Sequence, residues 1–171
     1  MLLKIGFGGG CHWCTEAVFL SLRGVLSVAQ GWIASNGVNA SFSEGVIVEY
    51  ESEVVPLGIL TAIHVYTHAA ASEHSMRHKY RSAVYHFDDK QVAEIRVALD
   101  KLQQDFDNQL ITQVLPYLDF KQNIEEQLNY YYSDPLRPFC QTYINPKLKL
   151  LLERFRDVTD TDKLNHLLKK N

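Results

Sequence analysis

The sequence predicts an α+β fold, in which helices pack on one mixed β-sheet to form a two-layer α/β sandwich. Short apolar segments of strand length alternate with amphipathic segments of helix length, and the connections between them are short. Neither an internal repeat nor a low-complexity linker divides the chain. We therefore expect one domain over residues 1–171, a length that can bury a substantial core.

The composition is that of an ordinary globular protein, with 46% hydrophobic and 22% charged residues. The net charge of −3 gives no reason to expect nucleic acid or a membrane as a partner. No segment reaches the length of a membrane span, and the chain begins with a predicted strand rather than a signal peptide. Three cysteines, an odd number, argue against a secreted disulfide scaffold. We expect a cytoplasmic monomer.

A cysteine follows a glycine-rich loop near the start of the chain. Residues 2–7 are predicted to form a buried strand, and residues 15–24 a helix that ends at Gly24. Cys11 therefore lies near a helix start, where free backbone N–H groups and the helix dipole lower a thiol pKa. The pattern favours a reactive cysteine over a small buried apolar residue.

The middle of the chain supplies further strands and helices. The Asn36-Gly37 turn predicts a hairpin of the two strands that flank it. In order, the expected elements are strands at 25–33 and 44–50, a helix at 56–65, an irregular segment at 66–79, a strand at 80–87, a helix at 90–105 and a strand at 111–115. Residues 120–171 are expected to hold a Gln/Glu/Asn-rich helical stretch, a Pro-rich turn and a last helix from about Pro146.

Three segments resemble motifs of the peptide methionine sulfoxide reductase A family. Residues 9–16 are similar to its Gly-Cys-Phe-Trp motif, and residues 44–50 to its Ala-Glu-Val-Val-x-Val-x-Tyr strand. Residues 79–85, Lys-Tyr-Arg-Ser-Ala-Val-Tyr, match its Gln-Tyr-Arg-Ser-Ala-Ile-Tyr. The resemblance covers roughly residues 4–110, and the tail from about residue 120 diverges. It implies the ferredoxin-like plait of the reductase A type.

The resemblance also implies a reaction, the thiol-dependent reduction of methionine S-sulfoxide, free or in proteins, as repair of oxidised proteins. Cys11 would be the nucleophile and Glu44 the acid that serves the sulfoxide oxygen, for which the carboxyl group needs to keep its proton near neutral pH. Tyr80 would hydrogen-bond the same oxygen. Trp13, with His12 beside it, would line the pocket for the substrate methyl group. Without the resemblance, Glu44 is a polar strand end and Trp13 a core residue.

A second thiol is needed to resolve the sulfenic acid that forms on Cys11. Cys140 lies at about the place of the family's C-terminal resolving cysteine, in a Pro-rich segment that we expect to be a mobile loop. Cys14 is the alternative, because Cys11-x-x-Cys14 has the spacing of a redox disulfide. The family implies thioredoxin, or another dithiol, as reductant, with no bound cofactor and no metal ion.

The chain departs from the family pattern at four places. His12 stands where the family usually has phenylalanine, and Ser75 where it has an aspartate. The loop at 34–43 is shorter and lacks a second oxygen-binding tyrosine, and residues 123–128 replace an Ala-Glu-Asp-Tyr-His-Gln stretch. These departures bear on substrate preference and rate more than on reaction type.

Three alternatives remain open. Cys11-His12-Trp13-Cys14 could serve a thioredoxin-like disulfide oxidoreductase, although no proline loop follows a central strand to face it. The protein could also be a non-catalytic or altered-specificity relative that binds methionine-rich peptides. Four histidines at i, i+4 spacings could hold zinc, but core or solvated histidines fit them better, with His68 or His74 near the site. They are His64, His68, His74 and His78.

Overall fold

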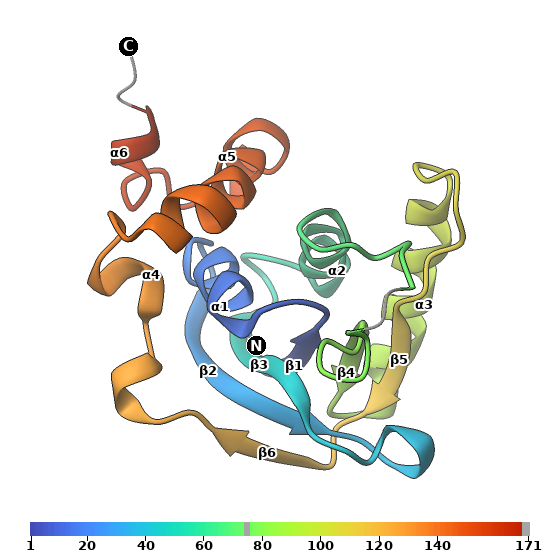
Figure 1. The fold of residues 1–171 in the computed structure, drawn as a ribbon. Coiled ribbons are helices and arrows are strands. Elements are labelled where there is room, and N and C mark those ends of the chain that lie inside the picture. Colours follow the sequence, from blue (N-terminus) through green and yellow to red (C-terminus); the bar gives the residue numbers. More distant parts are fainter. Residues whose placement is uncertain (74–75, 169–171) are drawn as a thin grey trace.

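A computed structural model describes residues 1–73 and 76–168 of the chain. Its centre is a six-stranded sheet of order β5-β4-β1-β3-β2-β6, with helices packed on it (Figure 1). Neighbouring strands are antiparallel except β4 and β5, which are parallel. The predicted α+β class with a mixed sheet is therefore confirmed. The strands are β1 Leu2–Gly8, β2 Val25–Ala34, β3 Ser43–Glu51, β4 Ala83–His86, β5 Gln113–Pro116 and β6 Asp119–Gln122.

The helices gather mainly over one face of the sheet. The aromatic rings of Phe7 on β1 and Phe19 on α1 stack there, with centroids 4.5 Å apart, and form part of the main core. A smaller cluster around Ile33 and Tyr85 covers the opposite face. The helices are α1 His12–Leu20, α2 Leu57–Tyr66, α3 Asp89–Gln103, α4 Tyr130–Ser133, α5 Asn145–Arg154 and α6 Asn165–Leu168, and a π-helical segment spans Cys140–Ile144. No helix among the described residues is long and apolar enough to cross a bilayer.

The N-terminal elements follow the predicted order, although the helix predicted at 15–24 begins and ends earlier, at His12–Leu20. β2 and β3 form the expected hairpin, and α1 begins at His12, so Cys11 is its N-cap residue. The strand predicted at 80–87 is shorter, because residues 79–82 bend away to contact the start of β3. The Glu44 N–H donates to the Lys79 carbonyl and the Arg81 N–H to the Ser43 hydroxyl. This bend carries Tyr80 toward Cys11.

The C-terminal prediction was partly wrong. Residues 119–122 form the edge strand β6 instead of the start of a helical stretch, because they pair with β2. The chain then runs to α4, and α5 packs against α1 (Figure 1). Glu16, 3% exposed on α1, anchors this return by accepting hydrogen bonds from the Asn129 and Tyr130 N–H groups. The C-terminal segment is therefore attached to the helix that carries the cysteines.

Candidate active site

Cys11 lies between the end of β1 and the first turn of α1, and is partly exposed. The loop before it needs glycine at position 9, where φ is +156°. A Cβ atom there would clash with the imidazole of His68, 2.7 Å from Nε2. Gly9 therefore lets the loop lie directly on His68, and this contact fixes the approach to Cys11.

The local electrostatics favour a thiolate on Cys11. The hydrogen bond from the Cys14 thiol is the largest influence that lowers the Cys11 pKa, and the Trp13 and Cys14 N–H groups add to it. Burial and the charge of Glu44 oppose the lowering only partly. Cys14 is affected oppositely, since its bond to Cys11 and its burial raise its pKa. Of the two sulfurs, Cys11 is thus the one whose surroundings favour the thiolate.

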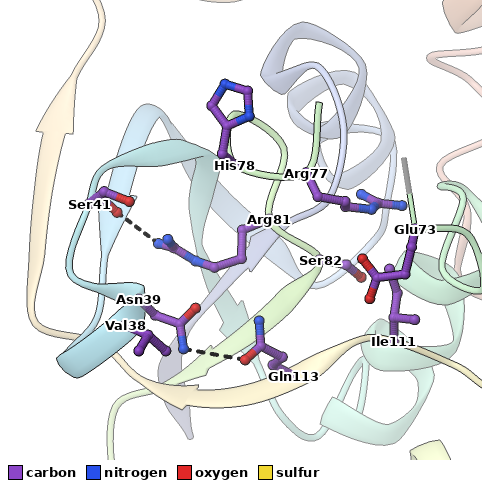
Figure 2. A pocket seen from close by; sticks show the side chains of 10 residues that line it. All are labelled: Val38, Asn39, Ser41, Glu73, Arg77, His78, Arg81, Ser82, Ile111 and Gln113. Carbon is purple, nitrogen blue, oxygen red and sulfur yellow. Dashed lines mark hydrogen bonds between the residues drawn. The ribbon is translucent and has the colours of Figure 1, made fainter. Parts of the chain in front are cut away.

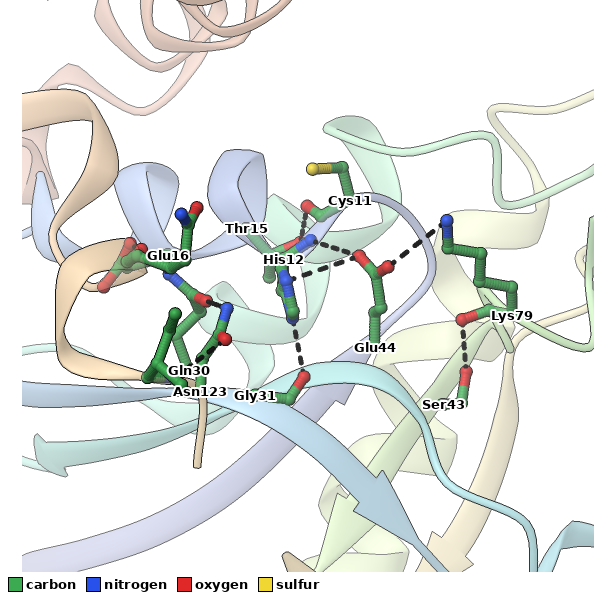
Figure 3. Close-up of polar contacts among 12 residues, drawn as sticks. Cys11, His12, Thr15, Glu16, Gln30, Gly31, Ser43, Glu44, Lys79 and Asn123 are labelled. Carbon is green, nitrogen blue, oxygen red and sulfur yellow. Dashed lines mark hydrogen bonds and ion pairs between the residues drawn. The ribbon is translucent and has the colours of Figure 1, made fainter. Parts of the chain in front are cut away.

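Glu44 lies on β3, and its carboxyl group reaches the N-terminus of α1. Its side chain is 10% exposed, and its Oε1 accepts a hydrogen bond from the His12 N–H at 3.1 Å. The Lys79 ammonium lies 3.7 Å from Oε2 (Figure 3). The Tyr80 hydroxyl, as the largest influence, and Glu44 raise the pKa of Lys79. Lys79 therefore connects the carboxyl group with Tyr80, the other residue predicted to serve the substrate oxygen.

A cavity of about 500 Å³ opens beside Cys11. It brings together Cys11 and Tyr80, as predicted, and its walls are largely apolar. Glu44, His12 and Trp13 are not among the residues that line it. The lining residues are Gly9, Gly10, Cys11, Cys14, His68, Ala69, Met76, Tyr80, Phe139, Thr142, Tyr143, Pro146 and Lys147.

Trp13 packs against the C-terminal segment. Its ring stacks on Tyr130 with centroids 3.9 Å apart and planes 3° from parallel, and Phe139 meets it edge-on at 5.4 Å. The Arg137 guanidinium lies over the Tyr130 ring at 4.2 Å. Tyr130 thus covers one face of the Trp13 indole. Phe139, and not Trp13, forms part of the apolar wall of the cavity.

His12 points away from the cavity. Its Nδ1 lies 2.7 Å from the Gly31 carbonyl oxygen and its Nε2 lies 3.7 Å from Glu44 Oε1. Its ring also meets the Trp32 ring edge-on, with centroids 5.2 Å apart. The residue predicted as a wall of the methyl pocket therefore contacts the acid instead.

Cys140 is fully buried at the beginning of the π-helical segment, so the expectation of a mobile loop was wrong. Its thiol donates to the Asp134 carbonyl at 3.7 Å, and burial raises its pKa. It belongs to the same core cluster as Cys14. Both candidate resolving thiols are therefore buried with raised pKa values, and Cys140 lies close enough to Cys14 to act on its pKa.

Two stacked histidines, the buried His64 and the partly exposed His68, lie beside the Gly9 loop. His64 and His68 stack with centroids 4.1 Å apart, and burial lowers both pKa values, that of His68 to about 3. His68 Nδ1 donates to the His64 carbonyl, and its Nε2 accepts from Ser82, 2.7 Å away. The Ser82 hydroxyl in turn hydrogen-bonds the Thr112 hydroxyl, 2.9 Å away. The sequence placed His68 or His74 near the site. The pattern that indicated the His64–His68 pair was their i, i+4 spacing at the end of the helix predicted at 56–65.

Lys147 was missed by the sequence reasoning. It extends from α5 into the cavity, donates to the Thr67 carbonyl and lowers the pKa of Cys14 by its charge. Its spacing from Leu148, Leu151 and Leu152 marks the polar side of an amphipathic helix. That pattern alone gives no sign of a neighbouring thiol.

Arg81 supports the site from the side opposite Cys11. Its guanidinium donates to the Ile33 and Ser41 carbonyls and to the Tyr85 hydroxyl, at 3.0–3.1 Å. Figure 2 shows it reaching across to the short loop after β2, beside a polar pocket of about 270 Å³. Arg81 therefore fixes the chain on which Lys79 and Tyr80 lie.

The zinc alternative has no assembled site in the part of the chain that the structure describes. Among residues 1–73 and 76–168, no three His, Cys, Asp or Glu side chains are grouped to hold a metal ion. His74 and Ser75 lie outside the described residues.

Comparison with known proteins gives one consistent result. The family model described as peptide methionine sulfoxide reductase matches residues 3–159. The peptide methionine sulfoxide reductase MsrA of Psychrobacter cryohalolentis is 31% identical over 162 residues, which cover 86% of this chain and 93% of that protein. MsrA of Trichodesmium erythraeum is 30% identical and covers 92% of this chain and 98% of its own length.

Solved structures share the fold. Mxr1 from Saccharomyces cerevisiae in reduced form superposes with a TM-score of 0.73 at 20% identity, over 83% of this chain and 91% of that one. Methionine sulfoxide reductase A of Corynebacterium diphtheriae has a TM-score of 0.64 at 20% identity, with coverage of 79% and 76%. Mxr1 has also been solved in complex with Trx2, with a TM-score of 0.59 at 23% identity, over 74% of this chain and 83% of that one.

Proposed function

This chain belongs to the peptide methionine sulfoxide reductase family, and we propose that it reduces methionine S-sulfoxide, free or in proteins, with Cys11 as nucleophile. The observation that carries the proposal is the placement of a cysteine with a lowered pKa at a helix start, open to an apolar cavity that Tyr80 also lines. A thiolate can attack sulfur there while the apolar wall accommodates a methionine side chain.

Glu44 and Tyr80 are the groups that we assign to the sulfoxide oxygen. Oxygen transfer consumes one proton: the Cys11 thiolate becomes a sulfenic acid and the sulfoxide becomes a thioether. Lys79 lies 3.7 Å from Glu44 Oε2, and Tyr80 and Glu44 raise its pKa, so the three polar groups form one cluster. Glu44 also acts on the Cys11 pKa by its charge, so the cluster lies beside the proposed nucleophile, which supports the assignment of Glu44 to the substrate oxygen.

For resolution we assign Cys140 to the attack on the sulfenic acid, with Cys14 as the alternative. The attack forms a disulfide and releases the oxygen as water. Both thiols are buried with raised pKa values, and Cys14 already hydrogen-bonds Cys11. A disulfide with Cys14 would lie within the first turn of α1, whereas the π-helical segment of Cys140 is a separate element that can move toward it.

Thioredoxin is the reductant that we assign to the resulting disulfide. Support comes from Mxr1, which shares this fold and has been solved in complex with Trx2. The role in the cell would be repair of oxidised proteins.

The test of the reaction is a single turnover without reductant. The wild type should form about one equivalent of methionine per protein from a peptide with methionine S-sulfoxide, and none from the R epimer. Cys11→Ser should form none, whereas Cys140→Ser should still form about one equivalent, since resolution follows oxygen transfer. A wild type without product, or a Cys11→Ser variant with the same yield, would refute the proposal.

The resolving thiol is identified by a mass-spectrometric disulfide map after that turnover. A Cys11–Cys140 bridge is expected, with Cys14 alkylated as a free thiol. A Cys11–Cys14 bridge with Cys140 free contradicts the assignment.

One observation favours altered substrate specificity as a second candidate. Trp13, the expected contact for the substrate methyl group, stacks on Tyr130 and does not line the cavity. Comparing kcat/KM for free methionine S-sulfoxide and for peptides with varied neighbours separates the candidates. A preference for one non-methionine sulfoxide over all methionine substrates would support the second.

A further inference from the structure

His12 is a buried imidazole with a directed contact at each ring nitrogen. Its side chain is 6% exposed, Nδ1 lies 2.7 Å from the Gly31 carbonyl oxygen, and Nε2 lies 3.7 Å from Glu44 Oε1. The His12 backbone N–H donates to the same Oε1 at 3.1 Å (Figure 3). One residue therefore holds the acid from two points.

The contact with Gly31 determines where the ring hydrogen is. A carbonyl oxygen accepts hydrogen bonds and cannot donate them, so Nδ1 carries the hydrogen. Nε2 then faces Glu44 in one of three ways: with a lone pair toward a protonated carboxyl group, with a second N–H toward a carboxylate, or with a lone pair toward a carboxylate. The first two arrangements hold one proton between His12 and Glu44, and the third holds none.

Other charges bear on this pair from each neighbouring element. Lys79 lies 3.7 Å from Glu44 Oε2 and, with the His12 N–H, favours the carboxylate. Burial of the carboxyl group and the thiolate on the adjacent Cys11 oppose it. On β2 the facing residues, Gly31 and Trp32, carry no charge.

The other buried acid near the site, Glu16 on α1, faces away from the His12–Glu44 pair. It accepts hydrogen bonds from Gln30 at 2.8 Å and from the N–H groups of Asn129 and Tyr130 at 2.8 and 3.3 Å. These donors compensate its charge, so Lys79 and Cys11 are the charged neighbours that act on the His12–Glu44 pair.

We propose that His12 is a positioning residue that stores the proton which Glu44 delivers to the substrate oxygen; the inference rests on the proposed sulfoxide reduction. The proton passes from Nε2 to the Glu44 carboxyl group and from there to the oxygen. Meanwhile the Cys11 Sγ–O bond forms and the S–O bond of the substrate breaks. Cys11 is oxidised by two electrons, the substrate sulfur is reduced by two, and His12 and Glu44 end as neutral imidazole and carboxylate. Solvent restores the proton after product release.

The present separation is compatible with this role. A distance of 3.7 Å between Nε2 and Oε1 is an ion-pair contact, longer than a hydrogen bond. Proton-transfer contacts are often long in a substrate-free enzyme and shorten in the complex.

The first test is the pH profile of kcat/KM for a peptide with methionine S-sulfoxide. In His12→Phe, which restores the family's usual residue, the alkaline limb should move to lower pH by about one unit, with about tenfold lower kcat/KM at pH 8. His12→Asn is the matched control, because its amide can still donate to Gly31 but has no atom at Nε2. It should show the same shift. An unshifted His12→Asn profile would overturn the proposal.

The second test needs no turnover and so separates this inference from the proposed reaction. Nitrogen-15 NMR of the histidine rings should find His12 with a hydrogen on Nδ1. Glu44→Gln should lower the pH midpoint at which His12 binds its second proton, because it removes the facing carboxylate. An unchanged midpoint refutes the proton store even if the enzyme is active. A shifted midpoint in a protein without turnover supports the pair and refutes the reaction.

Discussion

Two imidazoles flank the loop that carries Cys11, and their surroundings differ. His12 is buried and faces a carboxyl group with Lys79 beyond it, so charged groups lie on that side of Cys11. His68 is partly exposed and faces another imidazole, a carbonyl group and a hydroxyl, and burial lowers its pKa to about 3. The same side chain thus faces ionisable groups in one place and neutral hydrogen-bonding groups in the other.

The difference shows how the site separates two tasks. On the His12 side lie the groups that we assign to proton delivery to the substrate oxygen, His12 and Glu44. On the other side, the neutral His68 imidazole packs against the Gly9 loop and adds no charge near the thiols. Substitutions on the first side should change activity, and substitutions on the second should change stability.

Glu44→Gln should have the largest effect. It removes the proton donor but keeps the shape, so kcat/KM should fall about 100-fold or more while the urea midpoint stays within experimental error. Steady-state kinetics and urea unfolding measure the two effects. His64→Gln is the matched comparison, because His64 is buried beside His68 but does not line the cavity. An equal loss of kcat/KM in this variant would contradict the distinction between the two sides.

Gly9→Ala should destabilise the fold by about 3 kcal/mol, because the new Cβ clashes with His68 and the residue has a positive φ. Urea denaturation provides the measurement. Gly10→Ala is the control, since a Cβ at Gly10 meets no atom within 4 Å. Similar losses in both variants would show that the His68 contact is unimportant.

The pH dependence of stability should reveal His68. Folding lowers its pKa from 6.5 to about 3, so the unfolded chain binds the extra proton in that window. Stability conferred by the neutral imidazole is therefore complete above pH 6.5 and decreases as pH falls toward 3, by about 2 kcal/mol between pH 7 and pH 5.

Urea unfolding at pH 7 and pH 5 provides this measurement. His64 adds to the loss, because its pKa is also lowered. His68→Gln should lose about 2 kcal/mol less than the wild type over the same interval. An identical loss in the two proteins would mean that His68 is protonated in the fold.

Cys14→Ala should have the smallest effect, a rise in the Cys11 pKa, because the thiol donor is lost. Iodoacetamide alkylation as a function of pH, in a Cys140→Ser background, measures it. Cys14→Ser keeps a donor and should restore most of the shift. A pKa that does not change in Cys14→Ala would assign the lowering to the backbone N–H groups alone.

The sequence was sufficient for the elements that carry the nucleophile. Glycines before Cys11, an apolar pattern after it and the Asn36-Gly37 turn gave β1, α1 and the hairpin, because each depends on local preferences. β6 could not be recognised in this way. It contains a single apolar residue, Phe120, and forms because Gly31 lets the β6 backbone approach β2 closely.

Contacts in the site between segments distant in the chain could not be predicted from the sequence either. The pairing of His12 with Glu44 requires the register of β3 against β1, which no local pattern encodes. The burial of Cys140 did leave a signal, since Cys140, Ile144, Leu148 and Leu151 follow helical spacing and are all fully buried. Pro138 concealed that signal by favouring a loop.

The π-helical segment Cys140–Ile144 has a mechanical consequence. Its hydrogen bonds span one residue more than those of an α-helix, so the segment contains one residue of slack directly before α5. Transfer of that residue into an α-helical register rotates everything N-terminal to it by about 100° about the axis. Such a rotation would move Cys140, the first residue of the segment, relative to α5 without unfolding α5.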